Sequence, residues 1–270
     1  MKINPEFVTR IITSFLREEL KKLGFDQAIL GLSGGLDSSV VAFLAARALG
    51  PERVIGLILP YGDSFIQDTE DAQSVASSVG CRSRLIDIQP MIDVYFSLHP
   101  TDNLIQKGNK MARERMSILY DYSVREKALI LGTSNKSELL IGYGTIHGDM
   151  ACALNPLGDL YKTQVRELGA WLGVPKKILQ KKPTAGLWPG QTDEAEIGLS
   201  YEELDRILYE LVDLRRSRQD LIANGFDQAK VNRVWELMKQ NEFKRRMPPI
   251  VKVSARTVGH DFLYPYDWDR

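Results

Sequence analysis

The fold is decided by one stretch of the sequence, residues 28–39, which reads AILGLSGGLDSS. Its first five residues, Ala28–Leu32, form a short apolar run of the kind found in strands that are buried on both faces. A glycine-rich turn follows directly, and Val40–Leu49 then has the apolar periodicity of a helix. The stretch therefore predicts a strand, a tight loop and a helix, which together open a parallel α/β sheet.

Further strands and helices alternate along the first half of the chain. Val54–Leu59 and Leu129–Leu131 repeat the short apolar pattern, and Arg84–Ile88 is a weaker strand candidate. Helical patterns separate them, at 71–79 and in a long segment around 111–122. We therefore predict an α/β fold, a doubly wound parallel sheet flanked by helices in the Rossmann-like manner, with ligands at the carboxyl ends of its strands.

The second half of the chain is predicted to be a helical C-terminal part. Its helical patterns lie at 160–172, 201–214, 213–223 and 227–239. A further helix, amphipathic in pattern, is predicted at the N-terminus, over residues 1–23. Pro183–Gly198 contains prolines and glycines and is predicted to be a long loop, which we interpret as a lid. The aromatic tail Met247–Arg270, with Phe262, Tyr264, Tyr266 and Trp268, is expected to pack against the rest.

Composition excludes several classes of protein. The 270 residues include 35 Lys and Arg against 35 Asp and Glu, so no net charge attracts the chain to nucleic acid. Cys81 and Cys152 are far apart, which argues against a disulfide framework and a zinc site. The N-terminal segment lacks the apolar stretch of a signal peptide or membrane span. We expect one domain over residues 1–270, located in the cytoplasm, with neither a nucleic-acid nor a membrane partner.

The loop after the first strand has the chemistry of a phosphate site. Gly34 and Gly35 let the backbone turn its amides inward, Ser33 and Ser38 add hydroxyls, and a helix N-terminus follows. It is not a Walker loop, because no lysine follows the glycines, and it lacks the third glycine of the dinucleotide fingerprint. The structural alternative is a turn that caps the helix through Ser38 or Ser39.

This loop resembles that of the adenine-nucleotide α-hydrolases, also called N-type ATP pyrophosphatases, which cleave ATP between its α and β phosphates. Five further blocks, which stand in the order that this family has, narrow the resemblance to the NAD synthetases. The resemblance as a whole runs from about residue 29 to residue 268. These blocks are GTSNKSE (132–138), GYGT (142–145), PLGDLYKTQVR (156–166), KPTAGLW (182–188) and GQTDE (190–194).

The resemblance implies a reaction and its participants. ATP adenylates the carboxylate of nicotinic acid adenine dinucleotide (deamido-NAD) and releases pyrophosphate, and ammonia then displaces AMP to give NAD. Because two anions must meet, Mg²⁺ is expected beside ATP. The glutamine-using relatives carry an additional amidase domain, for which 270 residues leave no room. The resemblance further implies an ammonia-dependent ligase that forms a homodimer.

The resemblance also assigns roles to individual residues. The implied ATP contacts are Gly31, Leu32, Ser33, Gly34, Gly35, Leu36, Asp37, Ser38, Thr133, Lys162 and Thr184. Asp37 and Glu138 are implied to hold Mg²⁺, since both are hard oxygen ligands. Arg113 and Lys244 correspond to contacts with deamido-NAD. The implied catalytic residues are Asp149, as the holder of ammonium, and Lys162, as the cation that the glycine loop lacks.

Each of these residues has a structural alternative. Asp37 could cap a helix, Glu138 could be a first-turn carboxylate, and Lys162 could be a solvated surface lysine. Arg113 could pair with Glu114 or Glu126. Three family positions also differ, since the expected Lys, Asp and His are here Ile146, Ala153 and Phe243.

Two other functions share the loop. One is another ATP pyrophosphatase ligase, of the GMP synthetase or tRNA-modifying kind, although a tRNA enzyme would call for a basic surface. The other is a regulatory module that binds ATP without turnover. Pyrophosphate release that depends on deamido-NAD distinguishes the NAD synthetase from both.

Overall fold

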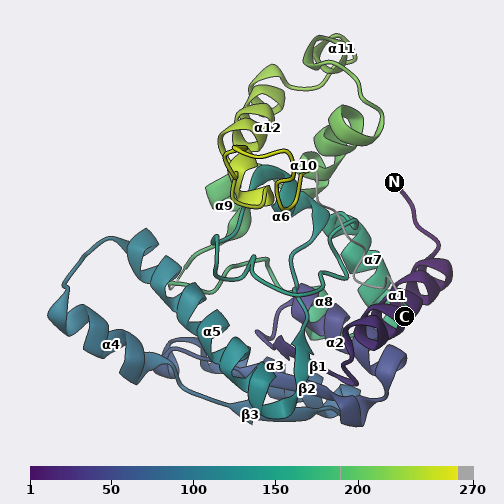
Figure 1. The fold of residues 1–270 in the computed structure, drawn as a ribbon. Coiled ribbons are helices and arrows are strands. Elements are labelled where there is room, and N and C mark those ends of the chain that lie inside the picture. The colour runs from purple at the N-terminus through teal and green to yellow at the C-terminus, as the bar shows by residue number, and fades with distance from the viewer. Residues whose placement is uncertain (189, 261–270) are drawn as a thin grey trace.

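The computed structural model describes residues 1–188 and 190–260, apart from the side chain of residue 64, and has a four-stranded parallel sheet at its centre (Figure 1). The strand order is β3-β2-β1-β4. Strands β1 (Gln27–Gly31) and β2 (Val54–Ile58) lie in the middle, and β3 (Arg82–Leu85) and β4 (Ala128–Ile130) form the edges. In the parallel register Ile29 lies beside Ile55 and Ile130. The predicted α/β fold is confirmed.

The strand order creates a ligand crevice. From β1 the chain proceeds outward to β2 and β3, and it then returns across the sheet to place β4 on the other side of β1. The helices that follow β1 and β4 therefore diverge from the sheet, and the space at the carboxyl ends of these two strands is a topological switch point. The glycine-rich loop lies at one side of that space and residues 131–135 lie at the other.

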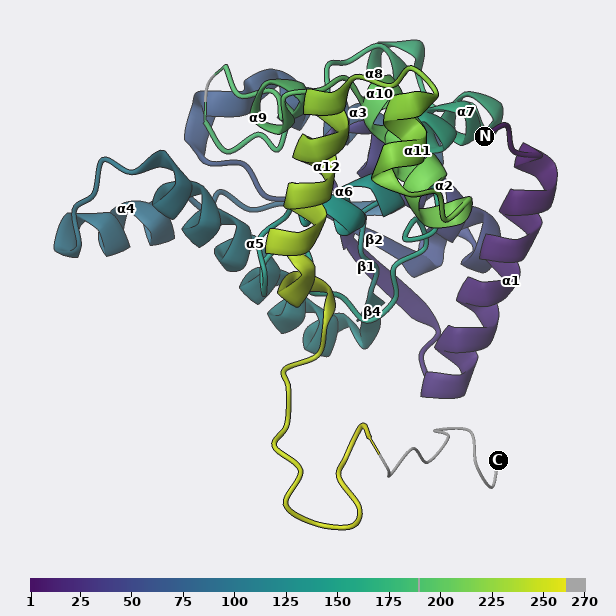
Figure 2. The ribbon, with the colours of Figure 1, turned by 90° about the horizontal axis from the view of Figure 1, so that it is seen from above.

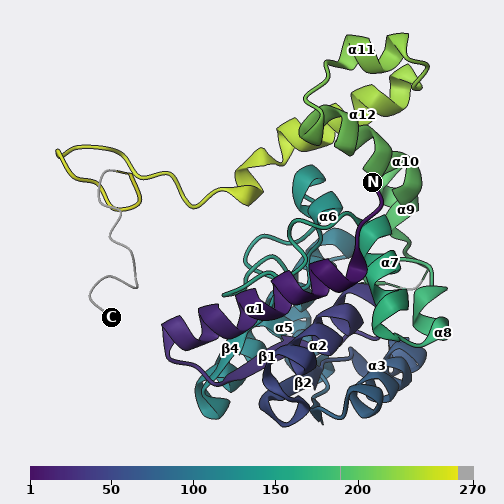
Figure 3. The ribbon, with the colours of Figure 1, turned by 90° about the vertical axis from the view of Figure 1, so that its right-hand side faces the viewer.

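Helices cover both faces of the sheet, because the side chains of its central strands alternate between two cores. Ala28 and Leu30 enter one core and Ile29 enters the other. The first core is covered by α1 (Pro5–Leu23), α2 (Leu36–Leu49), α3 (Ile66–Val79), α7 (Lys162–Leu172) and α8 (Lys176–Leu179), of which α1 and α2 lie together in Figure 3. The second core is covered by α4 (Gln89–Leu98) and α5 (Leu104–Glu126).

A third core joins the helices above the carboxyl edge of the sheet (Figure 1). Tyr201, Leu204 and Val231 are completely buried in it. Its helices are α6 (Lys136–Ile141), α9 (Asp193–Ile197), α10 (Tyr201–Leu208), α11 (Arg218–Ala223) and α12 (Gln228–Gln240). Short 3-10 segments are Pro51–Arg53, Gly62–Phe65 and Glu242–Arg245. No helix of the described residues has both the length and the apolar character to cross a bilayer.

Two predicted elements of the second half differ in the structure. Segment 183–198 is not a continuous loop, because its end forms α9, whose Ile197 packs into the third core. The helix predicted over 201–214 is α-helical only to Leu208 and continues as a π-helical turn, Tyr209–Asp213. The next helix starts at Arg218, where Ser217 accepts a hydrogen bond from the Asp220 amide.

Two further predictions differ at the edges of the molecule. Strand β3 occupies 82–85 and not 84–88, and all its residues are exposed, so it lacks the apolar pattern of a buried strand. The tail from Met247 to residue 260 extends away from the helices (Figure 2), and Met247, Val251 and Val253 are each at least 79% exposed. The expectation that this stretch packs against the protein is wrong. The four aromatic residues of the tail lie outside the described residues.

Candidate active site

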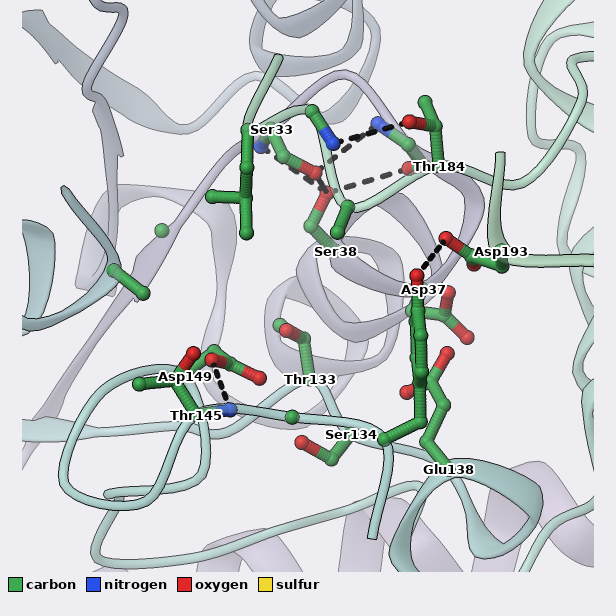
Figure 4. Close-up of a pocket in the computed structure, with 18 of the residues that line it drawn as sticks. Ser33, Asp37, Ser38, Thr133, Ser134, Glu138, Thr145, Asp149, Thr184 and Asp193 are labelled. Atoms are coloured by element: carbon green, nitrogen blue, oxygen red, sulfur yellow. Dashed lines mark hydrogen bonds between the residues drawn. The ribbon is translucent and has the colours of Figure 1, made fainter. Parts of the chain in front are cut away.

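A cavity of about 760 Å³ opens at the carboxyl ends of β1 and β4. It is lined by most of the residues that the sequence singled out, namely Gly31, Leu32, Ser33, Gly35, Leu36, Asp37, Ser38, Thr133, Glu138, Asp149, Lys162, Thr184 and Lys244. Gly34 and Arg113 do not line it. Figure 4 shows Asp37, Glu138 and Asp193 together on one side of the cavity, with Thr145 and Asp149 on another.

The glycine loop is shaped by its own backbone and hydroxyl groups. Gly34 has a φ of 72°, a left-handed conformation that favours glycine. The hydroxyls of Ser33 and Ser38 lie 3.0 Å apart, and the Gly35 amide donates to Ser33 Oγ at 3.2 Å. Ser39 Oγ donates to the Gly35 carbonyl, and no side chain among the described residues caps helix α2. The capping alternative for Ser38 and Ser39 is therefore wrong, and the N-terminus of α2 faces the cavity.

Lys162 joins the two predicted metal ligands. Its Nζ lies 2.5 Å from Asp37 Oδ2 and 3.1 Å from Glu138 Oε1, and its side chain is 6% exposed. Asn135 donates to the second oxygen of Asp37 at 3.1 Å. Lys162 is the first residue of α7, and its amide donates to Ser137 Oγ at 2.9 Å, which fixes α7 against α6. The alternative that Lys162 is a solvated surface lysine is wrong.

The protonation of this cluster follows from its burial. Burial disfavours the charge of Lys162, but the carboxylates of Asp37 and Glu138 outweigh it and raise its pKa. Burial raises the pKa of Glu138 to about 7, while Lys162 acts in the opposite direction. Lys162 therefore stays charged, and Glu138 can exchange a proton near neutral pH.

The carboxylates have the donor chemistry of a magnesium site that is completed by a substrate. Mg²⁺ is commonly bound through one or two carboxylates together with phosphates and water. In the described residues no group of three or more His, Cys, Asp or Glu residues could hold a metal by itself. Glu138 also serves structurally, since its Oε2 accepts from the Asn135 amide at 3.2 Å in a capping box, while Oε1 faces Lys162. Glu138 is thus a first-turn carboxylate, but it is not a solvated one, since its side chain is only 15% exposed. The pair of carboxylates has the donor chemistry that suits Mg²⁺ on a phosphate.

Asp149 lies on the opposite side of the cavity in a tight loop. Its Oδ1 accepts from the Thr145 amide at 2.9 Å. Burial raises the pKa of the Asp149 carboxyl, although the hydrogen bonds that it accepts and the positive charge of Lys244 act to lower it. Lys244 donates to the carbonyls of Gly142 and Gly144 at 2.8 and 3.0 Å, so it closes the start of this loop. The structure thus brings Asp149 and Lys244 to the same loop.

Arg113 is placed differently from the other predicted residues. It is exposed, and its Nε donates to the Ile146 carbonyl at 3.2 Å. It pairs with neither predicted acid, since Glu114 pairs with Lys110 and Glu126 with Arg82. Arg113 therefore borders the Asp149 loop from outside the cavity.

Comparison with known proteins identifies the family. A model of the NAD synthase family matches residues 8–248. The chain belongs to the NAD synthase family. It is 49% identical over 270 residues to the NH3-dependent NAD+ synthetase of Trichlorobacter lovleyi, covering all of this chain and 99% of that protein. The resemblance inferred from the sequence is confirmed.

Solved structures of similar proteins have the same fold. An NMN synthetase from Francisella tularensis superposes with a TM-score of 0.82 at 33% identity, over 93% of this chain and 99% of the other. An NH3-dependent NAD synthetase from Campylobacter jejuni has a TM-score of 0.80 at 33% identity, over 93% of this chain and all of the other. The NAD synthase fold therefore extends through both the sheet and the helical part.

Several cavity residues of this NAD synthase family member escaped the sequence analysis. Arg115 lines the cavity, its Nε donates to the Leu59 carbonyl at 3.0 Å, and burial lowers its pKa to about 10. Asp193 is 4% exposed and accepts from the hydroxyls of Tyr143 and Tyr201 at 3.0 and 3.1 Å. Tyr143 and Asp193 lie in the GYGT and GQTDE blocks, so a signal was present for them. Arg115 lies only two residues after Arg113, but the sequence singled out Arg113 and not Arg115.

Proposed function

We propose that the chain amidates deamido-NAD with ammonia, consuming ATP and giving NAD, AMP and pyrophosphate. The observation that carries this proposal is the position of Lys162, buried between Asp37 and Glu138 directly beside a glycine loop at the end of β1. A phosphate loop, a fixed cation and two carboxylates are what cleavage of ATP between its α and β phosphates requires. The family and its NH3-dependent relatives support the same reaction.

The loop and Lys162 would act on ATP. Amides at the start of α2 and the hydroxyls of Ser33 and Ser38 would bind the departing pyrophosphate, with the helix N-terminus favouring its charge. Lys162 would offset negative charge as the carboxylate of deamido-NAD approaches the α phosphate. The chain supplies no covalent nucleophile in this scheme, so its contribution is orientation and charge.

We propose that Asp37 and Glu138 hold Mg²⁺ when ATP is bound. The ion would neutralise charge on the phosphates. Lys162 keeps the two carboxylates within reach of one another, and Asn135 orients Asp37 through its amide. With Glu138 deprotonated, both residues would offer carboxylate oxygens to the ion, since both line the cavity.

Asp149 would serve the nitrogen substrate. A buried carboxylate attracts ammonium, and the raised pKa of Asp149 suits it to accept a proton from that ion. The resulting ammonia would attack the adenylated carboxyl and release AMP. Free ammonia, or ammonia from a separate glutaminase, is the proposed nitrogen source.

We further propose that the protein is a homodimer that works in the cytoplasm. Helix α4 and the start of α5 project from the sheet (Figure 1) and carry exposed apolar side chains, among them Val94, Leu98 and Ile105 at 63%, 71% and 65% exposed. Ile105 also lines the cavity, so a second copy on this face would border the dinucleotide. Leu98→Glu should yield monomers in size-exclusion chromatography with light scattering, whereas Glu18→Gln on α1 should not.

The test of the function is an assay of pyrophosphate release. We expect release to require ATP, ammonium and deamido-NAD, and to be slower with glutamine than with ammonium. Because one structural neighbour is an NMN synthetase, nicotinic acid mononucleotide is the second acceptor to assay, and xanthosine monophosphate tests a GMP synthetase. Release that depends on another acceptor, or tight ATP binding without release, would overturn the proposal.

A further inference from the structure

Lys181 lies against the glycine loop, and no motif or proposed step has given it a role. Its Nζ is 3.2 Å from the Gly34 carbonyl oxygen and 2.7 Å from a carboxylate oxygen of each of Asp68 and Asp71. These three acceptors match the three donors of an ammonium group. Lys181 is therefore held in one position, unlike a lysine on a solvated surface.

Asp71, one of the two carboxylates that hold Lys181, also pairs with a second lysine, Lys177, which provides a comparison. Asp71 is 3% exposed, and its other oxygen lies 2.7 Å from Lys177 Nζ. Lys181 and Asp68 line the cavity, whereas the side chain of Lys177 is 62% exposed and does not. The two lysines therefore share one ion-pair partner, and of the two, Lys181 reaches the loop.

The loop is pressed against helix α3 at this point. A Cβ on Gly34 would overlap the backbone carbonyl oxygen of Asp68 and approach the Ala72 amide to 3.1 Å. Gly34 also has its left-handed φ here. The backbone of the loop thus rests directly on α3, and Lys181 joins the two through Asp68 and Asp71.

Holding the Gly34 carbonyl sets the direction of the next amide. The Gly34 carbonyl and the Gly35 N–H belong to one peptide plane, and in a trans peptide they point in opposite directions. The described backbone contains no cis peptide. With its oxygen toward Lys181, this peptide directs the Gly35 N–H to the Ser33 Oγ side of the loop, at 3.2 Å.

We propose that Lys181 is a positioning residue for the pyrophosphate of ATP: it holds the Gly34 carbonyl and, through that peptide, directs the Gly35 amide toward the Ser33 hydroxyl, which lines the cavity. It also neutralises Asp68, whose carboxylate would otherwise face the phosphates across the cavity. This inference rests on the proposed function only in taking the glycine loop as the pyrophosphate site. Lys181 precedes Thr184 by three residues, so the same contact fixes the start of segment 183–198.

The test measures the binding of inorganic pyrophosphate with Mg²⁺ to the full chain by isothermal titration calorimetry. Lys181→Met should weaken binding about tenfold or more, as expected for loss of a hydrogen bond to a charged group together with an uncompensated carboxylate. Lys177→Met should change it by less than about twofold, because Lys177 does not reach the loop. Lys181→Arg should restore part of the affinity. Melting temperatures of both methionine variants establish that they fold.

Steady-state kinetics separates positioning from general destabilisation. Lys181→Met should raise the KM for ATP and leave the KM for deamido-NAD unchanged. Wild-type pyrophosphate affinity in Lys181→Met, or equal losses in Lys177→Met and Lys181→Met, would overturn the inference. If pyrophosphate binding depends on Lys181 but the wild-type chain does not amidate deamido-NAD, then the proposed function fails and the inference stands.

Discussion

Replacing Lys162 with methionine tests the electrostatic core of the site. Methionine preserves most of the side-chain volume and removes the charge that lies between Asp37 and Glu138. The two carboxylates then face each other in a buried place with Asp193 nearby. Removing one partner of a buried ion pair costs about 3–5 kcal/mol of folding free energy, because the remaining charge is uncompensated.

This cost can be converted into a melting temperature. For a chain of 270 residues, an unfolding entropy of about 2.1 cal/mol/K per residue gives roughly 0.6 kcal/mol/K. The variant should therefore melt about 5–9 °C below the wild type. Lys136→Met is the control from outside the cavity, since Lys136 pairs with Asp159, whose side chain is 96% exposed, and with Asp213, at 31%, so its loss should lower the melting temperature less than the loss of Lys162.

The loss of stability in the Lys162→Met variant should become larger as the pH rises. Burial raises the pKa of Glu138 to about 7 in spite of Lys162, and without Lys162 it rises further. A carboxyl with a raised folded-state pKa contributes stability at low pH and loses it as the pH rises through that pKa. Well above that pKa the wild type has completed this loss, while the variant, whose Glu138 has a still higher pKa, continues to lose stability. The difference in stability between the two proteins therefore widens as the pH rises.

Differential scanning calorimetry at about pH 6 and about pH 8.5 measures both the lower melting temperature of the variant and its dependence on pH. The double variant Lys162→Met/Glu138→Gln should recover part of the lost stability, because it removes one of the two unpaired charges. A Lys162→Met protein that melts within about 2 °C of the wild type at alkaline pH would refute the reasoning. A difference in melting temperature between the wild type and the variant that becomes smaller as the pH rises would also refute it.

Three more substitutions test other parts of the site. Asp37→Asn should lower kcat about 100-fold or more and leave the KM for deamido-NAD within about twofold, as measured by pyrophosphate release, and an unchanged kcat would remove Asp37 from the metal site. A non-glycine residue in the left-handed conformation costs roughly 1–2 kcal/mol of folding free energy. Gly34→Ala should lose more than this in chemical denaturation, since its Cβ would overlap the Asp68 carbonyl oxygen. Gly225→Ala should lose only that amount, because the space at its Cβ is open. Asp149→Asn should raise the KM for ammonium about tenfold and leave the KM for ATP unchanged, and the opposite pattern would move Asp149 to the ATP side.

Local patterns predicted the sheet well where strands are buried and poorly where they are not. β1, β2 and β4 are enclosed on both faces, so their residues are apolar and the short runs stand out. β3 is an edge strand with four exposed residues, and its polar sequence carries no such signal. Helix α9 was missed for a related reason, because it is only five residues long and its stability comes from Ile197 in the third core.

The sequence by itself determined the strand, loop and helix of the phosphate site, since adjacent residues and a left-handed glycine set that geometry locally. It also determined the family, through blocks that each keep their own local spacing. Only the tertiary structure decided the charge arrangement: Lys162 is 125 residues from Asp37, and Lys181 is 147 residues from Gly34. Such pairs meet because the sheet order and the packing of α7 on α2 bring distant segments together, and no local pattern encodes a contact that depends on the whole fold.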